Sequence, residues 1–265
     1  MMNILVPIGT SSNTNKTLQY AVDFAENFGA QIYVIEVFNA TGKTGTLTNV
    51  TQKIAESAKE RLKEVIGKVE TKNVSIKIAS FNGELKDGLK EIDKEIGIDL
   101  IILAPRSNDI REEYYLGQTS GTIIKRTNIP TLIVPKGTAY KTFKTILVAF
   151  KSGILKRKRI LDPLIEIKSK HKANINLLMV KTPGYSDDDL KINTALMDIS
   201  SQLTFTENPT TYHGVLEHFQ AQHPDLLCVF RRKRGFFKKL WEKSTISKSE
   251  FYAPIPVLVL SVKKD

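Results

Sequence analysis

The chain has 265 residues, of which 41% are hydrophobic and 25% are charged, as in an ordinary globular protein. No apolar run approaches the roughly 20 residues that a membrane-spanning helix needs. A single cysteine, Cys228, excludes an intramolecular disulfide and any site built from several cysteines. The first residues lack the features of a secretory signal, so we expect a cytoplasmic protein.

The charge is unevenly distributed along the chain. Residues 1–140 hold 17 basic and 16 acidic side chains, whereas residues 141–265 hold 22 and 12. Nearly all of the net charge of +11 therefore lies in the second half. This asymmetry favours an anionic partner for that half.

In the first half, short apolar runs alternate with segments that carry hydrophobic residues at helical spacing. Strands are predicted at residues 3–8, 31–38, 74–80, from 99 onward and at 131–134. Helices are predicted at residues 16–28, 50–69, 85–96 and after Gly117. Strands that alternate with helices predict a parallel, doubly wound α/β sheet, whose ligands bind at the carboxyl ends of the strands.

The second half repeats this pattern at an offset of 126 residues. Asp99-Leu-Ile-Ile-Leu returns as Asp225-Leu-Leu-Cys-Val, and the closing strand returns at residues 257–260. Further strands are predicted at 144–150 and 173–180, and helices at 160–170, through about residue 203, at 212–220 and after Thr245. The repeat predicts two tandem domains, residues 1–137 and 142–265, each with a five-stranded parallel sheet.

These residues resemble the universal stress protein family in tandem form. The resemblance rests on Ile4-Leu-Val-Pro7, its repeat Ile146-Leu-Val-Ala149, the two Asp-led fourth strands and the closing strands. It implies a Rossmann-like fold and a binding or regulatory role in the stress response. It also implies that the two domains pack face to face as an intramolecular counterpart of the family dimer. The closing strands could pair domain to domain, or chain to chain in a homodimer.

The resemblance also implies an adenine nucleotide site, for ATP or AMP, in the first domain. Nucleotide-binding members have an Asp after the first strand and a Gly-x-x-Gly after the fourth; here Gly9, Ala104 and Ser107 occupy these three places. Gly117 keeps its family position, where a helix start suits a phosphate or is an ordinary cap. Arg106 could pair with a phosphate or with Asp109. The expected ligand residues are Pro7, Ile8, Gly9, Val37, Leu103, Ala104, Arg106, Gly117, Gln118, Thr119 and Ser120.

Two basic clusters follow strands of the second domain, at residues 151–159 and 231–241. Because both leave carboxyl ends of strands, we expect them to border one crevice and to bind an anion, although each alone could be a solvated face. The expected residues of this site are Lys151, Arg231, Arg232, Arg234, Ser244 and Thr245.

The sequence leaves more than one function open. The first is a protein that binds an adenine nucleotide or another anionic small molecule. The second is a scaffold without nucleotide that binds a protein partner through the basic aromatic flap at residues 231–241. ATP hydrolysis is the third, although no general base or metal-binding carboxylate stands at an expected position. The four histidines are scattered, so no metal site is predicted. The single basic aromatic segment makes no strong case for nucleic-acid or membrane-surface binding, and no nucleic-acid module is recognised.

Overall fold

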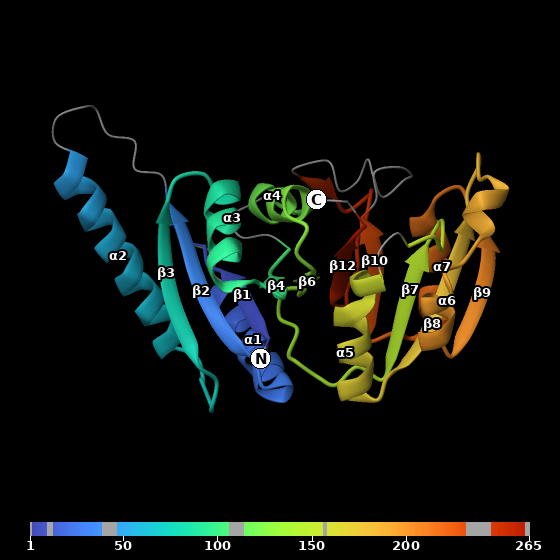
Figure 1. Cartoon of the computed structure of the whole chain (residues 1–265), viewed down its shortest axis with the longest axis horizontal. Coiled ribbons are helices and arrows are strands. Elements are labelled where there is room, and N and C mark those ends of the chain that lie inside the picture. Colours follow the sequence, from blue (N-terminus) through green and yellow to red (C-terminus); the bar gives the residue numbers. More distant parts are fainter. Residues whose placement is uncertain are drawn as a thin grey trace.

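The computed structural model of the chain describes residues 2–9, 13–38, 47–105, 114–155, 158–231 and 245–262. A ten-stranded sheet runs through the molecule in the order β3-β2-β1-β4-β6-β12-β10-β7-β8-β9 (Figure 1). Its strands are β1 (Asn3–Pro7), β2 (Gln31–Phe38), β3 (Ile76–Asn82), β4 (Leu100–Leu103), β6 (Thr131–Ile133), β7 (Thr145–Phe150), β8 (Asn174–Lys181), β9 (Gln202–Glu207), β10 (Leu226–Arg231) and β12 (Val257–Ser261). The first half of the chain holds β1 to β6 and the second half holds β7 to β12.

Helices cover both faces of the sheet because alternate residues of each strand enter two separate cores. Ile4 and Val6 of β1 lie in one core, and Leu5 lies in the other. On the first face lie α1 (Thr14–Phe28), α2 (Leu47–Gly67), α5 (Asp162–His171) and α6 (Thr194–Ile199). On the second face lie α3 (Leu85–Ile96), α4 (Gln118–Arg126) and α7 (Thr211–Gln222). Two short 3-10 helices are η1 (Lys158–Leu161) and η2 (Asp187–Leu190). The architecture is the doubly wound α/β fold that the sequence predicts.

The two halves join edge to edge. β6 and β12 pair antiparallel, with Leu132 opposite Leu258, while the other described pairs of the large sheet are parallel. Of the two alternatives for the closing strands, pairing between the two halves of the chain is the one observed, but the expected face-to-face packing is wrong. An antiparallel edge contact satisfies the open backbone groups of both closing strands, which face-to-face packing would leave unpaired.

A second, smaller contact between the halves lies beside α4. β5 (Tyr114–Leu116) pairs antiparallel with β11 (Ile246–Ser247) in a separate two-stranded sheet. Neither strand was predicted, because each is very short and gains its partner from the other half of the chain.

The strand and helix predictions hold best in the first half. The observed bounds of β2 and α3 match them, and α1 ends at the predicted Gly29, whose φ of 62° is a conformation that glycine adopts without strain. In the second half, the helix expected to continue through residue 203 ends at Ile199, and Gln202–Glu207 forms β9 instead. Its alternating Thr204, Phe205 and Thr206 suit a strand that pairs with β8.

Among the described helices, none has both the length and the apolar character to cross a membrane.

Candidate ligand-binding site

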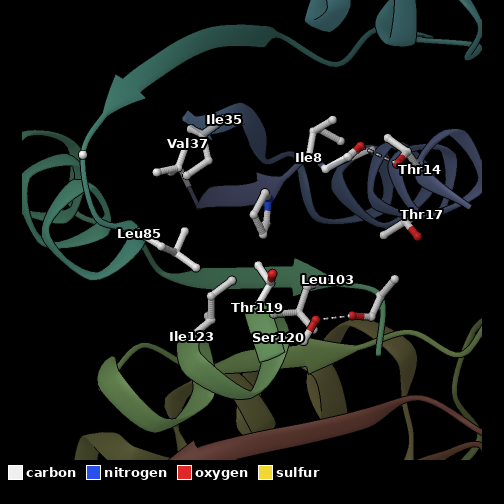
Figure 2. A pocket seen from close by; sticks show the side chains of 14 residues that line it. Ile8, Thr14, Thr17, Ile35, Val37, Leu85, Leu103, Thr119, Ser120 and Ile123 are labelled. Carbon is white, nitrogen blue, oxygen red and sulfur yellow. Dashed lines mark hydrogen bonds between the residues drawn. The ribbon is translucent and has the colours of Figure 1, made fainter. Parts of the chain in front are cut away.

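A pocket of about 220 Å³ opens at the carboxyl ends of the strands in the first half (Figure 2). Its walls come from β1, β2 and β4 and from the N-terminal parts of α1, α3 and α4. The lining residues are Pro7, Ile8, Gly9, Thr14, Thr17, Ile35, Val37, Gly83, Leu85, Leu103, Ala104, Thr119, Ser120 and Ile123. The pocket therefore lies where a doubly wound sheet places its ligands.

Most of the pocket wall is apolar. Figure 2 shows Val37 from β2, Leu85 from α3 and Ile123 from α4 around the same opening, with Ile8 at the end of β1. Because these side chains come from four separate elements, they could enclose a flat apolar group on several sides. No charged side chain is among the described residues that line the pocket.

Polar groups are concentrated where α4 begins. Gly117 is the N-cap of α4 and has an extended conformation. Because the helix begins there, the backbone N–H groups of its first turn have no acceptor within the helix. The Ser120 hydroxyl donates a hydrogen bond of 2.7 Å to the carbonyl oxygen of Ala104, which ties α4 to the end of β4. The Thr119 hydroxyl also lines the pocket and makes no hydrogen bond to a described residue. It is thus available to a ligand.

The opposite side of the pocket is lined by two threonines from the first turn of α1. The Thr14 hydroxyl donates to the carbonyl oxygen of Gly9 at 3.1 Å, and the Thr17 hydroxyl donates to the carbonyl oxygen of Asn13 at 3.2 Å. Both hydroxyl protons are engaged by backbone carbonyl groups. Thr119 is therefore the better hydroxyl donor to a bound molecule.

A family model described as the universal stress protein family matches residues 1–135, about half of the chain. The chain belongs to the universal stress protein family. Among curated proteins it is similar to universal stress protein MJ0531 of Methanocaldococcus jannaschii, at 25% identity over 138 residues, which cover 50% of this chain and 81% of the relative.

Solved structures of other proteins share the fold. A universal stress protein from Archaeoglobus fulgidus matches with a TM-score of 0.74 at 19% identity, over 98% of each chain. PA1789 from Pseudomonas aeruginosa, described as functionally unknown, matches with a TM-score of 0.60 at 15% identity, over 99% of this chain and 93% of its own. Both matches extend over the two halves, and at these identities they bear on the fold alone.

In this universal stress protein, many of the residues expected to bind ligand in the first half lie around one pocket. They are Pro7, Ile8, Gly9, Val37, Leu103, Ala104, Thr119 and Ser120. Gly117 and Gln118 lie just outside, as the N-cap and first residue of α4. Arg106 lies outside the described residues.

Sequence reasoning missed several lining residues, including Leu85 and Ile123. Their helical spacing predicts only that they face the sheet, and it does not indicate which end of a helix reaches the strand ends. Gly83 could have indicated that the start of α3 lies near the pocket, since it stands between β3 and α3 at the same edge of the sheet as the other strand ends.

The structure corrects one residue of the anion site predicted in the second half. Arg231 was expected to border a basic crevice, but it is only 3% exposed, and its guanidinium donates hydrogen bonds to Lys125, Thr127, Asn128 and Ser261 at the junction of the halves. Those bonds use the groups that an anion would need, so that assignment of Arg231 is corrected.

The other residues expected in the second-half site are not brought together among the described residues. Lys151 is partly exposed, and its ammonium lies 3.5 Å from the carbonyl oxygen of Gly184. Thr245 was expected at a helix start, but it precedes the strand β11, so that expectation is wrong. Arg232, Arg234 and Ser244 lie outside the described residues, as does the flap at residues 232–241 that was considered for a protein partner.

Cys228 is fully buried in β10, as expected of a core residue. Burial raises the pKa of its thiol far above the ordinary value. A thiol that stays protonated is a poor nucleophile, which leaves Cys228 a packing role.

Proposed function

We propose that this universal stress protein is a cytoplasmic binding protein that acts in the stress response by holding an adenine nucleotide, ATP or AMP, in its first-half pocket. The observation that carries the proposal is a mostly apolar pocket at the strand ends, open to the first turn of α4 and without a charged side chain among its described lining residues. A purine ring needs apolar surfaces on its faces and a few hydrogen-bonding groups at its edge.

The pocket is large enough to enclose only part of a nucleotide. At about 220 Å³ it is smaller than the roughly 300–1,000 Å³ of pockets that enclose drug-sized molecules. The base and part of the ribose would be enclosed, and the phosphates would extend out of the pocket. The positive end of the α4 dipole and its free N–H groups favour an anionic group on that side.

A binding role fits the described lining better than a catalytic one. Hydrolysis of a bound nucleotide at its phosphates needs a group that positions or deprotonates water, and none of the described lining residues is a carboxylate, histidine or lysine. We therefore propose regulation through ligand occupancy, without turnover of the ligand.

Calorimetric titration with adenosine, AMP and ATP tests the proposal. We expect all three to bind, and we expect Thr119→Val to weaken adenosine binding about five- to tenfold, the effect of one lost hydrogen bond of about 1–1.5 kcal/mol. Thr245→Val is the matched control, because Thr245 occupies the same position of the repeat, 126 residues later. It should leave adenosine affinity unchanged.

Two results would overturn the proposal. One is the lack of any heat of binding at millimolar adenosine, AMP and ATP. The other is binding that Thr119→Val and a bulky Val37→Trp both leave unchanged, since a tryptophan at Val37 should occupy the space for the base.

A further inference from the structure

The strand register shows which residues of the second half correspond to those of the pocket. In the first half Ile4 pairs with Leu100, and in the second half Ile146 pairs with Leu226. Moving four residues along each strand places Phe150 at the position of Ile8 and Phe230 at the position of Ala104. The two halves can therefore be compared position by position at their strand ends.

Aromatic rings occupy these positions in the second half. Phe150 is 1% exposed, Phe230 is 2% exposed, and their ring centroids are 6.3 Å apart. In the first half, Ala104 has only a methyl group there and lines the open pocket. Ile8 lines the same pocket (Figure 2). The difference between a methyl group and a phenyl ring is large relative to a pocket of about 220 Å³.

A second, independent difference concerns the backbone. In the first half, Thr119 lies in the first turn of α4, whose free N–H groups face the pocket side. In the second half, Thr245 is followed by the strand β11 and then by a turn that leads to the fully buried Phe251. No helix starts there among the described residues, so these residues offer no helix dipole to an anionic group.

We propose that the chain binds one ligand, in its first half, and that the size of the side chain at the positions of Ala104 and Phe230 determines which half has a binding pocket. The identity of the ligand rests on the proposed function, whereas the presence or absence of a cavity does not. The second half then serves as a filled partner that completes the sheet.

Exchange of the two side chains tests this inference. Ala104→Phe should close the first pocket, and Phe230→Ala should open a second one. Phe230→Leu is a milder change that keeps the test valid if the alanine variant does not fold. Each protein is titrated with indole, a neutral bicyclic probe of purine-like shape, and separately with adenosine.

For indole we expect one equivalent bound by the wild-type protein, none by Ala104→Phe, and a second equivalent by Phe230→Ala or Phe230→Leu. For adenosine we expect one equivalent in the wild type and in both Phe230 variants, because no counterpart of α4 begins at Thr245 among the described residues of the second half, and none in Ala104→Phe.

A measurement without ligand gives an independent readout. Cys228 is the chain's single cysteine and lies two residues before Phe230, on the same face of β10. Opening a cavity at Phe230 should speed the reaction of Cys228 with a thiol reagent at least tenfold, whereas Ala104→Phe should leave its rate unchanged.

The outcomes separate this inference from the proposed function. If adenosine binds nowhere but indole and Cys228 follow the expected pattern, the proposed ligand is wrong and the inference stands. The inference is overturned if Ala104→Phe still binds one equivalent of indole. It is also overturned if neither Phe230 variant binds a second equivalent of indole or reacts faster at Cys228.

Discussion

Arg231 in β10 donates a hydrogen bond of 2.8 Å from Nη1 to the carbonyl oxygen of Lys125, near the end of α4 in the other half of the chain. Nη2 donates to the carbonyl oxygen of Thr127, to Oδ1 of Asn128 and to Oγ of Ser261. The last carbonyls of a helix have no partners within the helix, and a cation at that end also interacts favourably with the helix dipole. Burial lowers the pKa of Arg231 to about 10, which still leaves it charged at pH 7.

We expect Arg231→Met to lower the free energy of unfolding by about 3–5 kcal/mol, as when one partner of a buried polar network is removed. The methionine fills much of the space but leaves buried carbonyl groups without donors. Urea unfolding at pH 7 measures the change. Arg159→Met is the matched control, since the side chain of Arg159 is 94% exposed, and it should change stability by no more than about 0.5 kcal/mol. Equal losses in the two variants would show that Arg231 does not hold the halves together.

Arg231 also shows where sequence reasoning stops. Its place at the end of a strand was predicted, because buried strands are recognised from short apolar runs. Its hydrogen-bond partners Lys125 and Thr127 were not predicted, since they lie more than 100 residues away in the sequence. The pairing of β6 with β12 brings them close to Arg231. The direction of a side chain at a strand end depends on such pairing, which no local pattern encodes.

The first-half pocket was easier to anticipate. Strand ends of a doubly wound sheet meet at one edge, and the family resemblance implied that Ile8, Val37 and Leu103 lie there as ligand contacts. The aromatic pair at the strand ends of the second half could not be predicted in this way. Phe150 and Phe230 read simply as apolar strand residues until the register brings their rings together.

His171 predicts a pH dependence of stability. It is 8% exposed, its Nδ1 accepts the backbone N–H of Phe143 at 3.1 Å, and its Nε2 lies 2.8 Å from the Tyr140 hydroxyl. Burial, with a smaller effect of Lys170, lowers the pKa of His171 in the folded protein. The unfolded chain therefore binds a proton near pH 6.5 that the folded chain resists. The contribution of His171 is fully present above that pH and is lost as the pH falls below it.

Urea unfolding between pH 7.5 and 5.5 tests this dependence. The wild-type protein should lose more stability over this range than His171→Gln, whose side chain does not titrate. Other titrating groups contribute to both proteins, so the difference between the two curves isolates His171. Parallel curves would contradict the prediction.

Asp225 predicts a further effect at acidic pH. Its carboxylate accepts hydrogen bonds from Nζ of Lys141 at 2.6 Å and from the backbone N–H groups of Lys144 and Thr145 at 2.8 and 3.1 Å. Burial raises its pKa, but these hydrogen bonds outweigh that effect and hold the pKa below its usual range. The stabilisation is present above about pH 4, where the unfolded chain is ionised, and is lost as the pH falls through the lower folded value.

Asp225→Asn should therefore lower the free energy of unfolding at pH 7 by about 1–3 kcal/mol and flatten the loss of stability between pH 5 and 3. Asp99→Asn is the matched control, because Asp99 occupies the same position of the repeat and accepts one backbone hydrogen bond, from Asn3 at 2.7 Å. A loss in Asp99→Asn as large as that in Asp225→Asn would show that the additional bonds of Asp225 add nothing.

Gly214 predicts a steric limit on the helix α7. A Cβ atom at this position would lie 2.7 Å from Cγ2 of Val180 in β8, whereas one at Gly67, the last residue of α2, would meet nothing within 4 Å. Gly88 in α3 stands at the same position of the repeat, where a Cβ would lie 2.6 Å from the ring of Phe81. Both halves thus use a glycine for the close approach of a helix to the sheet.

Alanine favours a helix over glycine by about 1 kcal/mol, so the sign of the change shows which effect dominates. We expect Gly214→Ala to lower the free energy of unfolding by about 1–3 kcal/mol, because the extra methyl group forces α7 away from Val180. Gly67→Ala, the same substitution in open space, should leave stability unchanged or raise it slightly. Thermal and urea unfolding measure both variants. If Gly214→Ala stabilises the protein as much as Gly67→Ala does, α7 has room to move, and the close helix approach is not required by the fold.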